Sequence, residues 1–171
     1  MKYWPILLLT ICLLTAALAE AETIYTYKSD AARSGYLSSA LPDSTETAWS
    51  FKKNGWFSPL VVHNLIVYGG SEDGHLYAVY AYNGQEAWSF EAGAEVYAPT
   101  LFSGRLYFGS ANGRVYCLDA ETGENIWSFQ TEDAVRSTPL VVDNRVFVVS
   151  TDNFLYVLSA LSGELLWKVS V

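Results

Sequence analysis

Tryptophan recurs along this chain at a nearly constant spacing. Intervals of 39, 39 and 40 residues separate Trp49, Trp88, Trp127 and Trp167. The last three of these each stand four residues after a glycine, namely Gly84, Gly123 and Gly163. Self-similarity at a fixed period near 40 residues indicates a chain built from repeated supersecondary units. This repeat constrains the fold more strongly than any single motif does.

Each repeat divides into four short segments with the character of β-strands. We place the units at about residues 58–91, 98–130 and 138–170, and each starts with a proline followed by an apolar run. Between the second and third segments stand the dipeptides Asp73-Gly74, Asn112-Gly113 and Asp152-Asn153. Such dipeptides favour tight hairpins in which both central residues adopt positive φ. Each unit therefore reads as a four-stranded antiparallel meander.

Four antiparallel strands in about 40 residues predict one blade of a β-propeller. We predict an all-β fold: a partial propeller of about three blades within residues 48–171, with Ala48-Trp49-Ser50-Phe51 as an orphan outer strand. A blade cannot bury both of its apolar faces alone, so the units must stack. A β-sandwich is the alternative, but it does not explain the fixed interval from glycine to tryptophan.

The number of predicted blades is smaller than a closed ring needs. Closed propellers usually contain about four to eight blades. We therefore interpret the chain as the N-terminal part of a longer propeller or as a shortened gene product. The last blade would then expose one face, which permits self-association.

The first 19 residues have the pattern of a secretory signal peptide. Lys2 precedes an apolar stretch over residues 6–18, and Ala17-Leu18-Ala19 provides small residues at a cleavage site. This pattern predicts export to the periplasm or the cell exterior, with a retained anchor as the alternative. Residues 20–47 form an irregular lead-in segment. Cleavage would leave Cys117 as the remaining cysteine, so we expect no internal disulfide.

Charge and motif content argue against several functions. The formal net charge of −8 disfavours nucleic acid as a partner. His63 and His75 fall beside turns without a second ligand at metal-binding spacing. The chain contains no nucleophile elbow and no phosphate-binding glycine loop. We therefore predict no catalytic, cofactor-binding or metal-binding residues.

The repeat does yield candidate docking residues and one candidate contact with a partner. An indole at the same place in each unit can cover the next sheet and join the two, which makes the four tryptophans and the three glycines docking residues. Trp56-Phe57 stands outside the repeat pattern, whose equivalent positions we take to be Val96-Tyr97 and Arg136-Ser137. We interpret Trp56-Phe57 as a candidate partner contact, with packing at the blade edge as the alternative. Gly69-Gly70 predicts a β-bulge beside a crowded contact between blades.

The second unit resembles a known family motif. Cys117-x-Asp119-x-x-Thr122-Gly123-x-x-x-Trp127 is similar to the tryptophan-docking motif of the pyrroloquinoline quinone (PQQ)-like repeat family, which usually begins with alanine. The first unit has Tyr80 in place of the aspartate, and the third has Ser159. The resemblance implies a propeller and a docking role for Asp119.

The family resemblance implies two classes of function. Some members are quinoprotein dehydrogenases, which hold PQQ and Ca²⁺ with a catalytic aspartate and, in many members, an adjacent cysteine pair. This sequence has no such pair. Other members, similar to the outer-membrane barrel-assembly lipoprotein, are not enzymes and bind proteins. We expect a non-catalytic protein-binding or scaffolding module without a cofactor. The alternative is the N-terminal part of a PQQ-dependent dehydrogenase whose active-site residues lie beyond this chain.

Overall fold

The computed structural model describes residues 47–171 and contains twelve β-strands in this range. The strands are β1 (Val61–His63), β2 (Ile66–Gly70), β3 (His75–Tyr80), β4 (Glu86–Glu91), β5 (Thr100–Phe102), β6 (Arg105–Gly109), β7 (Arg114–Asp119), β8 (Asn125–Gln130), β9 (Leu140–Val142), β10 (Arg145–Val149), β11 (Phe154–Ser159) and β12 (Leu165–Ser170). The predicted signal peptide, residues 1–19, and nearly all of the lead-in segment, residues 20–47, lie outside the described residues. Within the described range no helix has the length and apolarity needed to cross a membrane.

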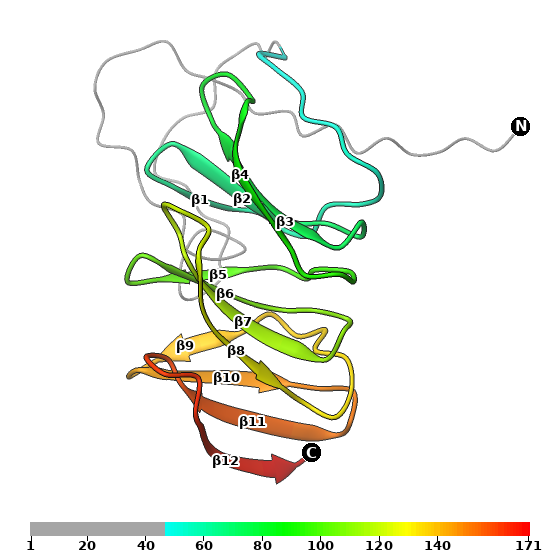
Figure 1. Cartoon of the computed structure of the whole chain (residues 1–171), viewed down its shortest axis with the longest axis vertical. Coiled ribbons are helices and arrows are strands. Elements are labelled where there is room, and N and C mark those ends of the chain that lie inside the picture. The colour runs from blue at the N-terminus through cyan, green and yellow to red at the C-terminus, as the bar shows by residue number, and fades with distance from the viewer. Residues whose placement is uncertain (1–46) are drawn as a thin grey trace, which may run out of the picture.

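The strands form three four-stranded antiparallel sheets, each a meander of neighbouring strands. The orders are β1-β2-β3-β4, β5-β6-β7-β8 and β9-β10-β11-β12. The sheets lie one after another along the long axis of the molecule (Figure 1). This arrangement confirms the all-β class and the four-stranded blades of a partial propeller.

The three sheets repeat the same pairing in detail. In each sheet the third and fourth strands shift register at one point, and the tryptophan lies just beyond that irregularity. Trp88 pairs with Ala78, Trp127 with Cys117 and Trp167 with Val157. The three tryptophans therefore occupy equivalent places on the outer strands. Gly69 and Gly70 pair regularly with β3, so the bulge predicted there is wrong.

The core consists of two layers of side chains, one at each junction between sheets. The first layer includes Tyr68, Leu76, Phe108 and Leu118, and the second includes Tyr107, Val115, Val148 and Leu158. These eight side chains are buried, with at most 1% of their surface exposed. Apolar burial between blades stabilises the fold by about 25 cal/mol for each Å² removed from water.

The hairpin turns differ from the prediction. Positive φ at both central residues occurs between the first and second strands of each sheet, at Asn64-Leu65, Ser103-Gly104 and Asp143-Asn144. Between the second and third strands only the last turn residue has positive φ, at Gly74, Gly113 and Asn153. In that turn the amide of Gly74 donates to the carbonyl of Ser71. The first residue of each dipeptide, Asp73, Asn112 or Asp152, thus serves as a side-chain acceptor rather than as a residue with positive φ.

The predicted orphan strand is not formed. Residues 48–51 have no strand assignment, although Trp49 within them docks on the first sheet. A strand exists only through a ladder of hydrogen bonds to a neighbour, and the described residues provide none for this segment. Residues 48–51 therefore match the sequence of the outer strands but do not form a strand.

Candidate functional site

Three indoles dock in the same way on the sheet that follows them. The indole N–H of Trp49 donates to the carbonyl of Ala81 at 2.7 Å. The corresponding bonds join Trp88 to Ala120 at 3.3 Å and Trp127 to Ala160 at 3.1 Å. Each accepting alanine directly follows the third strand of the next sheet. Trp167 occupies the equivalent strand position but is 47% exposed.

The glycine of each unit lies directly beneath the indole of the preceding unit. Gly84, Gly123 and Gly163 have φ of 72°, 75° and 74°. A Cβ at these three positions would lie 2.5, 2.7 and 2.6 Å from ring atoms of Trp49, Trp88 and Trp127, respectively. The glycine therefore serves a tryptophan about 35 residues before it, in addition to closing its own hairpin. Sequence reasoning identified these residues but did not pair them in this way.

A buried tyrosine donates a second hydrogen bond to the docking carbonyl. The hydroxyl of Tyr68 donates to the Ala120 carbonyl at 3.0 Å, and that of Tyr107 donates to the Ala160 carbonyl at 3.2 Å. Burial is the main cause that raises the pKa of both hydroxyls to about 12, so they remain protonated donors. Sequence reasoning missed these tyrosines. The available signal was tyrosine at the same place in two units.

Asp119 holds the hairpin that carries Gly123. Its Oδ1 accepts from the backbone N–H groups of Glu121 and Thr122, both at 2.9 Å, and from the Thr122 hydroxyl at 3.2 Å. The Thr122 amide is the largest influence that lowers the pKa of this carboxyl. In the third unit Ser159 stands in place of this aspartate, and its hydroxyl accepts a single, longer hydrogen bond from the Ser162 amide at 3.3 Å.

Asp73 and Asp152 also have structural partners. Asp73 accepts from the His75 amide at 3.2 Å and from the Tyr77 hydroxyl at 2.9 Å. Asp152 accepts from the Phe154 amide at 3.0 Å and from the Tyr156 hydroxyl at 2.7 Å. Both carboxylates are therefore used in turn geometry, as the hairpin positions predicted.

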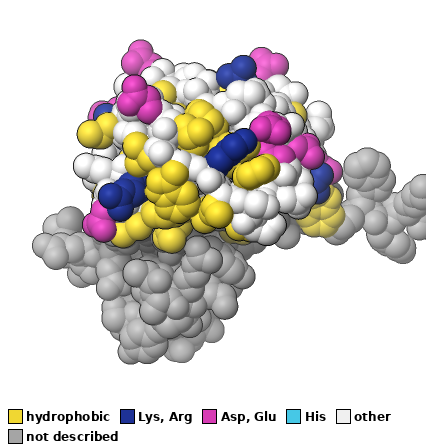
Figure 2. Space-filling model, turned by 90° about the horizontal axis from the view of Figure 1, so that it is seen from below, with side chains coloured by type: hydrophobic (Ala, Val, Ile, Leu, Met, Phe, Trp, Pro, Cys, Tyr) yellow, Lys and Arg dark blue, Asp and Glu magenta, His cyan; other side chains and the backbone are white. Residues whose placement is uncertain are grey.

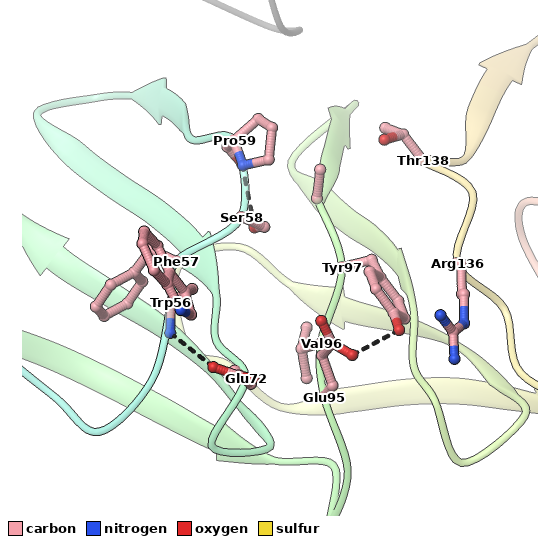
Figure 3. A pocket seen from close by; sticks show the side chains of 11 residues that line it. Trp56, Phe57, Ser58, Pro59, Glu72, Glu95, Val96, Tyr97, Arg136 and Thr138 are labelled. Atoms are coloured by element: carbon pink, nitrogen blue, oxygen red, sulfur yellow. Dashed lines mark hydrogen bonds between the residues drawn. The ribbon is translucent and has the colours of Figure 1, made fainter. Parts of the chain in front are cut away.

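A groove runs across the segments that lead into the three sheets (Figure 3). It encloses about 220 Å³ and is lined by Trp56, Phe57, Ser58, Pro59, Glu72, Glu95, Val96, Tyr97, Ala98, Arg136 and Thr138. Consecutive sheets contribute to it because the stretch before the first strand of each sheet crosses the same edge of the stack. We call each of these stretches the lead-in segment of its sheet, as distinct from residues 20–47. Clefts that bring several segments together are the usual places for ligands.

Of the Trp56-Phe57 pair, Trp56 is exposed and Phe57 is packed against the first sheet. Trp56 is 48% exposed, and Gly55 with φ of 95° turns the chain so that the Trp56 amide donates to Glu72 Oε2 at 3.2 Å. Phe57 packs against Phe51, with ring centroids 6.0 Å apart. The alternative of edge packing therefore describes Phe57, whereas Trp56 remains open to a partner.

Backbone contacts also correct the predicted equivalence of this pair. Phe57 bridges to Ser71 as Val96 bridges to Ser110. Trp56 therefore corresponds to Glu95, one residue earlier than the sequence comparison placed it. In the third unit the carbonyl of Ala134 plays the same part as that of Trp56. Trp56, Glu95 and Ala134 each stand seven residues after the preceding docking tryptophan, whereas the interval to the next proline is three, four and five residues. Alignment on the prolines therefore misplaced the pair by one residue in the second unit and by two in the third.

The groove carries charges of both signs. The hydroxyl of Tyr97 donates to Glu95 Oε2 at 2.7 Å. Desolvation and this bond raise the pKa of Tyr97 to about 12, while nearby Arg136 acts in the opposite direction. Arg136 is exposed and lies beside the Tyr97 ring, whereas Trp56 and Phe57 line the opposite side (Figure 3). An extended peptide could meet aromatic, acidic and basic groups there in succession.

The described residues do not form a calcium site of the kind that accompanies PQQ. Calcium requires several oxygen ligands converging on one point. Residues 47–171 contain no group of three or more His, Cys, Asp or Glu side chains arranged to hold a metal. Cys117 is fully buried, and that burial raises the pKa of its thiol to about 11.

The stacked four-stranded sheets, joined by indoles that dock on Ala carbonyls, define a repeat β-propeller protein. The chain belongs to the PQQ-like repeat family, because the family model described as outer membrane protein assembly factor BamB matches residues 72–171. A search of curated protein sequences finds no match.

Solved structures share the fold at low sequence identity. BamB from Moraxella catarrhalis is 20% identical with a TM-score of 0.64, covering 74% of this chain and 41% of that one. Quinohemoprotein alcohol dehydrogenase from Comamonas testosteroni is 20% identical with a TM-score of 0.74, covering 89% of this chain and 28% of that one. The computationally designed Ika4 protein is 22% identical with a TM-score of 0.63, covering 69% of this chain and 74% of that one. The chain thus spans about two fifths of the BamB structure.

Proposed function

We propose that this protein is an exported, non-catalytic module that binds a peptide segment of a partner protein in the groove beside Trp56. The observation that carries this proposal is the 48% exposure of Trp56 in a groove that also holds Tyr97, Arg136 and two carboxylates. Exposed tryptophan, tyrosine and arginine are enriched at the energetic centres of protein interfaces. Export rests on the signal-like pattern of residues 1–19.

The groove suits an extended ligand better than a compact one. Three lead-in segments border it in succession, so a bound chain can contact each in turn (Figure 3). Arg136 suits an acidic group, and Glu72 and Glu95 suit a basic group. Steering by these charges would make association faster at low ionic strength than at high ionic strength.

A displayed library of random peptides tests the proposal. Panning against the purified protein should enrich related sequences, and their binding should weaken at least about tenfold in Trp56→Ala and in Arg136→Glu. Tyr82→Ala provides the matched control, since Tyr82 is 55% exposed outside the groove. Equal weakening in all three variants, or no enrichment, would contradict the proposal. Saturable stabilisation by PQQ with Ca²⁺ would favour the quinoprotein alternative instead.

A further inference from the structure

The outward face of the third sheet is apolar and uncovered. Six side chains on it define what we call the third-sheet face: Leu140, Val142, Phe147, Val149, Trp167 and Val169. Cross-strand pairing places them on one side, since Leu140 opposes Phe147 and Val157 opposes both Phe147 and Trp167. Leu140 is 55% and Trp167 47% exposed. The counterpart of Leu140 in the first sheet, Val61, is 1% exposed because the second sheet covers it.

This face differs from the two faces that join sheets within the chain. At those junctions Gly70 and Gly109 allow the backbone of the next lead-in segment to approach, because a Cβ at Gly70 would overlap the Val96 carbonyl and one at Gly109 the Val135 carbonyl. The third sheet has Val149 at this position. A further sheet docking in the same register would therefore collide with the Val149 side chain.

The hydrogen-bonding element of the junction is also absent from this face. Tyr68 and Tyr107 donate their hydroxyls to the docking carbonyl of the next sheet. Phe147 occupies the equivalent position and packs edge-on against Trp167, with ring centroids 6.4 Å apart. The third-sheet face thus occupies the same position as the junction faces, but it lacks the tyrosine hydroxyl that donates to the next sheet.

Head-to-tail stacking of copies is blocked at the other end of the molecule. The surface of the first sheet that would receive an indole is already occupied, because Trp49 lies on Gly84 and donates to the Ala81 carbonyl. Phe51 covers Tyr77 of the same sheet, with ring centroids 5.4 Å apart. Trp167 of a second copy cannot reach this acceptor while Trp49 is docked.

We propose that the third-sheet face pairs with the same face of a second copy, forming a two-fold symmetric dimer. A two-fold interface uses one patch twice and must be self-complementary, which an apolar sheet face satisfies. Two such faces can pack about 10 Å apart with interdigitating side chains. The chain carries a net charge of −8, but none of the six side chains is charged. One basic side chain, exposed Arg145, lies on the same side of the sheet, opposite Val142 at the start of β10. Hydrophobic groups gather over the middle of this end of the molecule, with basic groups among them (Figure 2).

Sedimentation velocity of the purified protein over a range of concentrations tests this proposal. The expected result is a reversible equilibrium that stops at the dimer. Val149→Glu should weaken the dimer at least about tenfold, because the carboxylate would be desolvated without a partner. Ile126→Glu, at a 41% exposed site on β8, is the matched control and should leave it unchanged.

Each other outcome overturns the proposal. A monomer at all concentrations, a series of larger oligomers, or equal effects of the two substitutions would each contradict a two-fold dimer through this face. Far-UV circular dichroism and thermal unfolding establish that the variants fold. If Val149→Glu fails to fold, Val142→Lys, at a 45% exposed position of the same face, replaces it with the same expectation.

Discussion

At the scale of single residues, the glycine before each tryptophan satisfies two demands at once. Gly123 has φ of 75° to close its hairpin, and its lack of a side chain lets the Trp88 ring lie against the backbone. The sequence predicted the first demand from turn chemistry. It could not predict the second, because the contact joins residues of different units. Periodicity shows that positions are equivalent without showing which ones meet.

Gly123→Ala should therefore destabilise the protein more than Gly104→Ala. Both glycines have positive φ, 75° and 73°, but a Cβ at Gly104 would meet nothing within 4 Å. Alanine at Gly104 should lower the unfolding free energy by about 1 to 2 kcal/mol through backbone strain alone. Alanine at Gly123 should cost about 1 to 3 kcal/mol more through overpacking against Trp88. Urea unfolding measures both, and equal losses would contradict indole docking.

Leu65 is a site where substitution should stabilise the fold. It has φ of 61° in an exposed hairpin turn, a conformation that asparagine and glycine tolerate better than leucine. Leu65→Asn should raise the unfolding free energy by about 0.5 to 1 kcal/mol. The reverse change at the equivalent turn position, Asn144→Leu, should lower it by a similar amount. Thermal unfolding of the two variants checks the prediction, and changes of the same sign would refute it.

Asp119 should make stability depend on pH in the acid range. Its pKa is lowered in the folded protein, first by the Thr122 amide, so its contribution is complete above the unfolded value of about 3.9. That contribution disappears as pH falls through the lower folded pKa. Asp119→Asn should be less stable than the wild type at pH 6, and the difference should shrink as pH drops below about 4. A difference that does not vary with pH would contradict this role.

At the scale of secondary-structure elements, the strands were predictable but the turns and the orphan strand were only partly so. Alternating apolar runs within each unit marked the strands that the structure contains. The Asp-Gly and Asn-Gly dipeptides marked hairpins correctly but implied the wrong turn type. Residues 48–51 match the outer strand in sequence and form none, since pairing depends on a neighbour rather than on local sequence.

The indole joins one sheet to the next, so its removal should lower the free energy of unfolding. Trp127 is 8% exposed and donates to Ala160 of the following sheet. Trp127→Phe should reduce the unfolding free energy by about 1 to 3 kcal/mol, because buried area and a hydrogen bond are lost. Trp56→Phe, at a 48% exposed site, should change it by less than about 0.5 kcal/mol. Chemical denaturation distinguishes the two, and similar losses would argue against docking.

At the scale of the whole molecule, the sequence specified a stack of blades but not the surfaces that the stack presents. The groove depends on lead-in segments from three sheets, and their equivalence to Trp56 was misplaced by one residue in the second unit and by two in the third. Likewise, the roles of Val149 and Phe147 become clear only by comparison with their structural equivalents. Val149 stands where Gly70 and Gly109 allow close approach, and Phe147 stands where the other two sheets have a docking tyrosine. Sites assembled across repeats are set by spatial neighbours, which a single sequence does not display.

Hydrogen exchange at the tryptophan indole N–H groups, followed by nuclear magnetic resonance, tests whether the docked indoles join the sheets. The docked indoles of Trp88 and Trp127 should exchange at least about a hundredfold more slowly than that of half-exposed Trp56, because exchange requires separation of the sheets. Trp49, docked in the same way on the first sheet, should be protected as well. If Trp88 and Trp127 exchange as fast as Trp56, the sheets are not joined by their tryptophans.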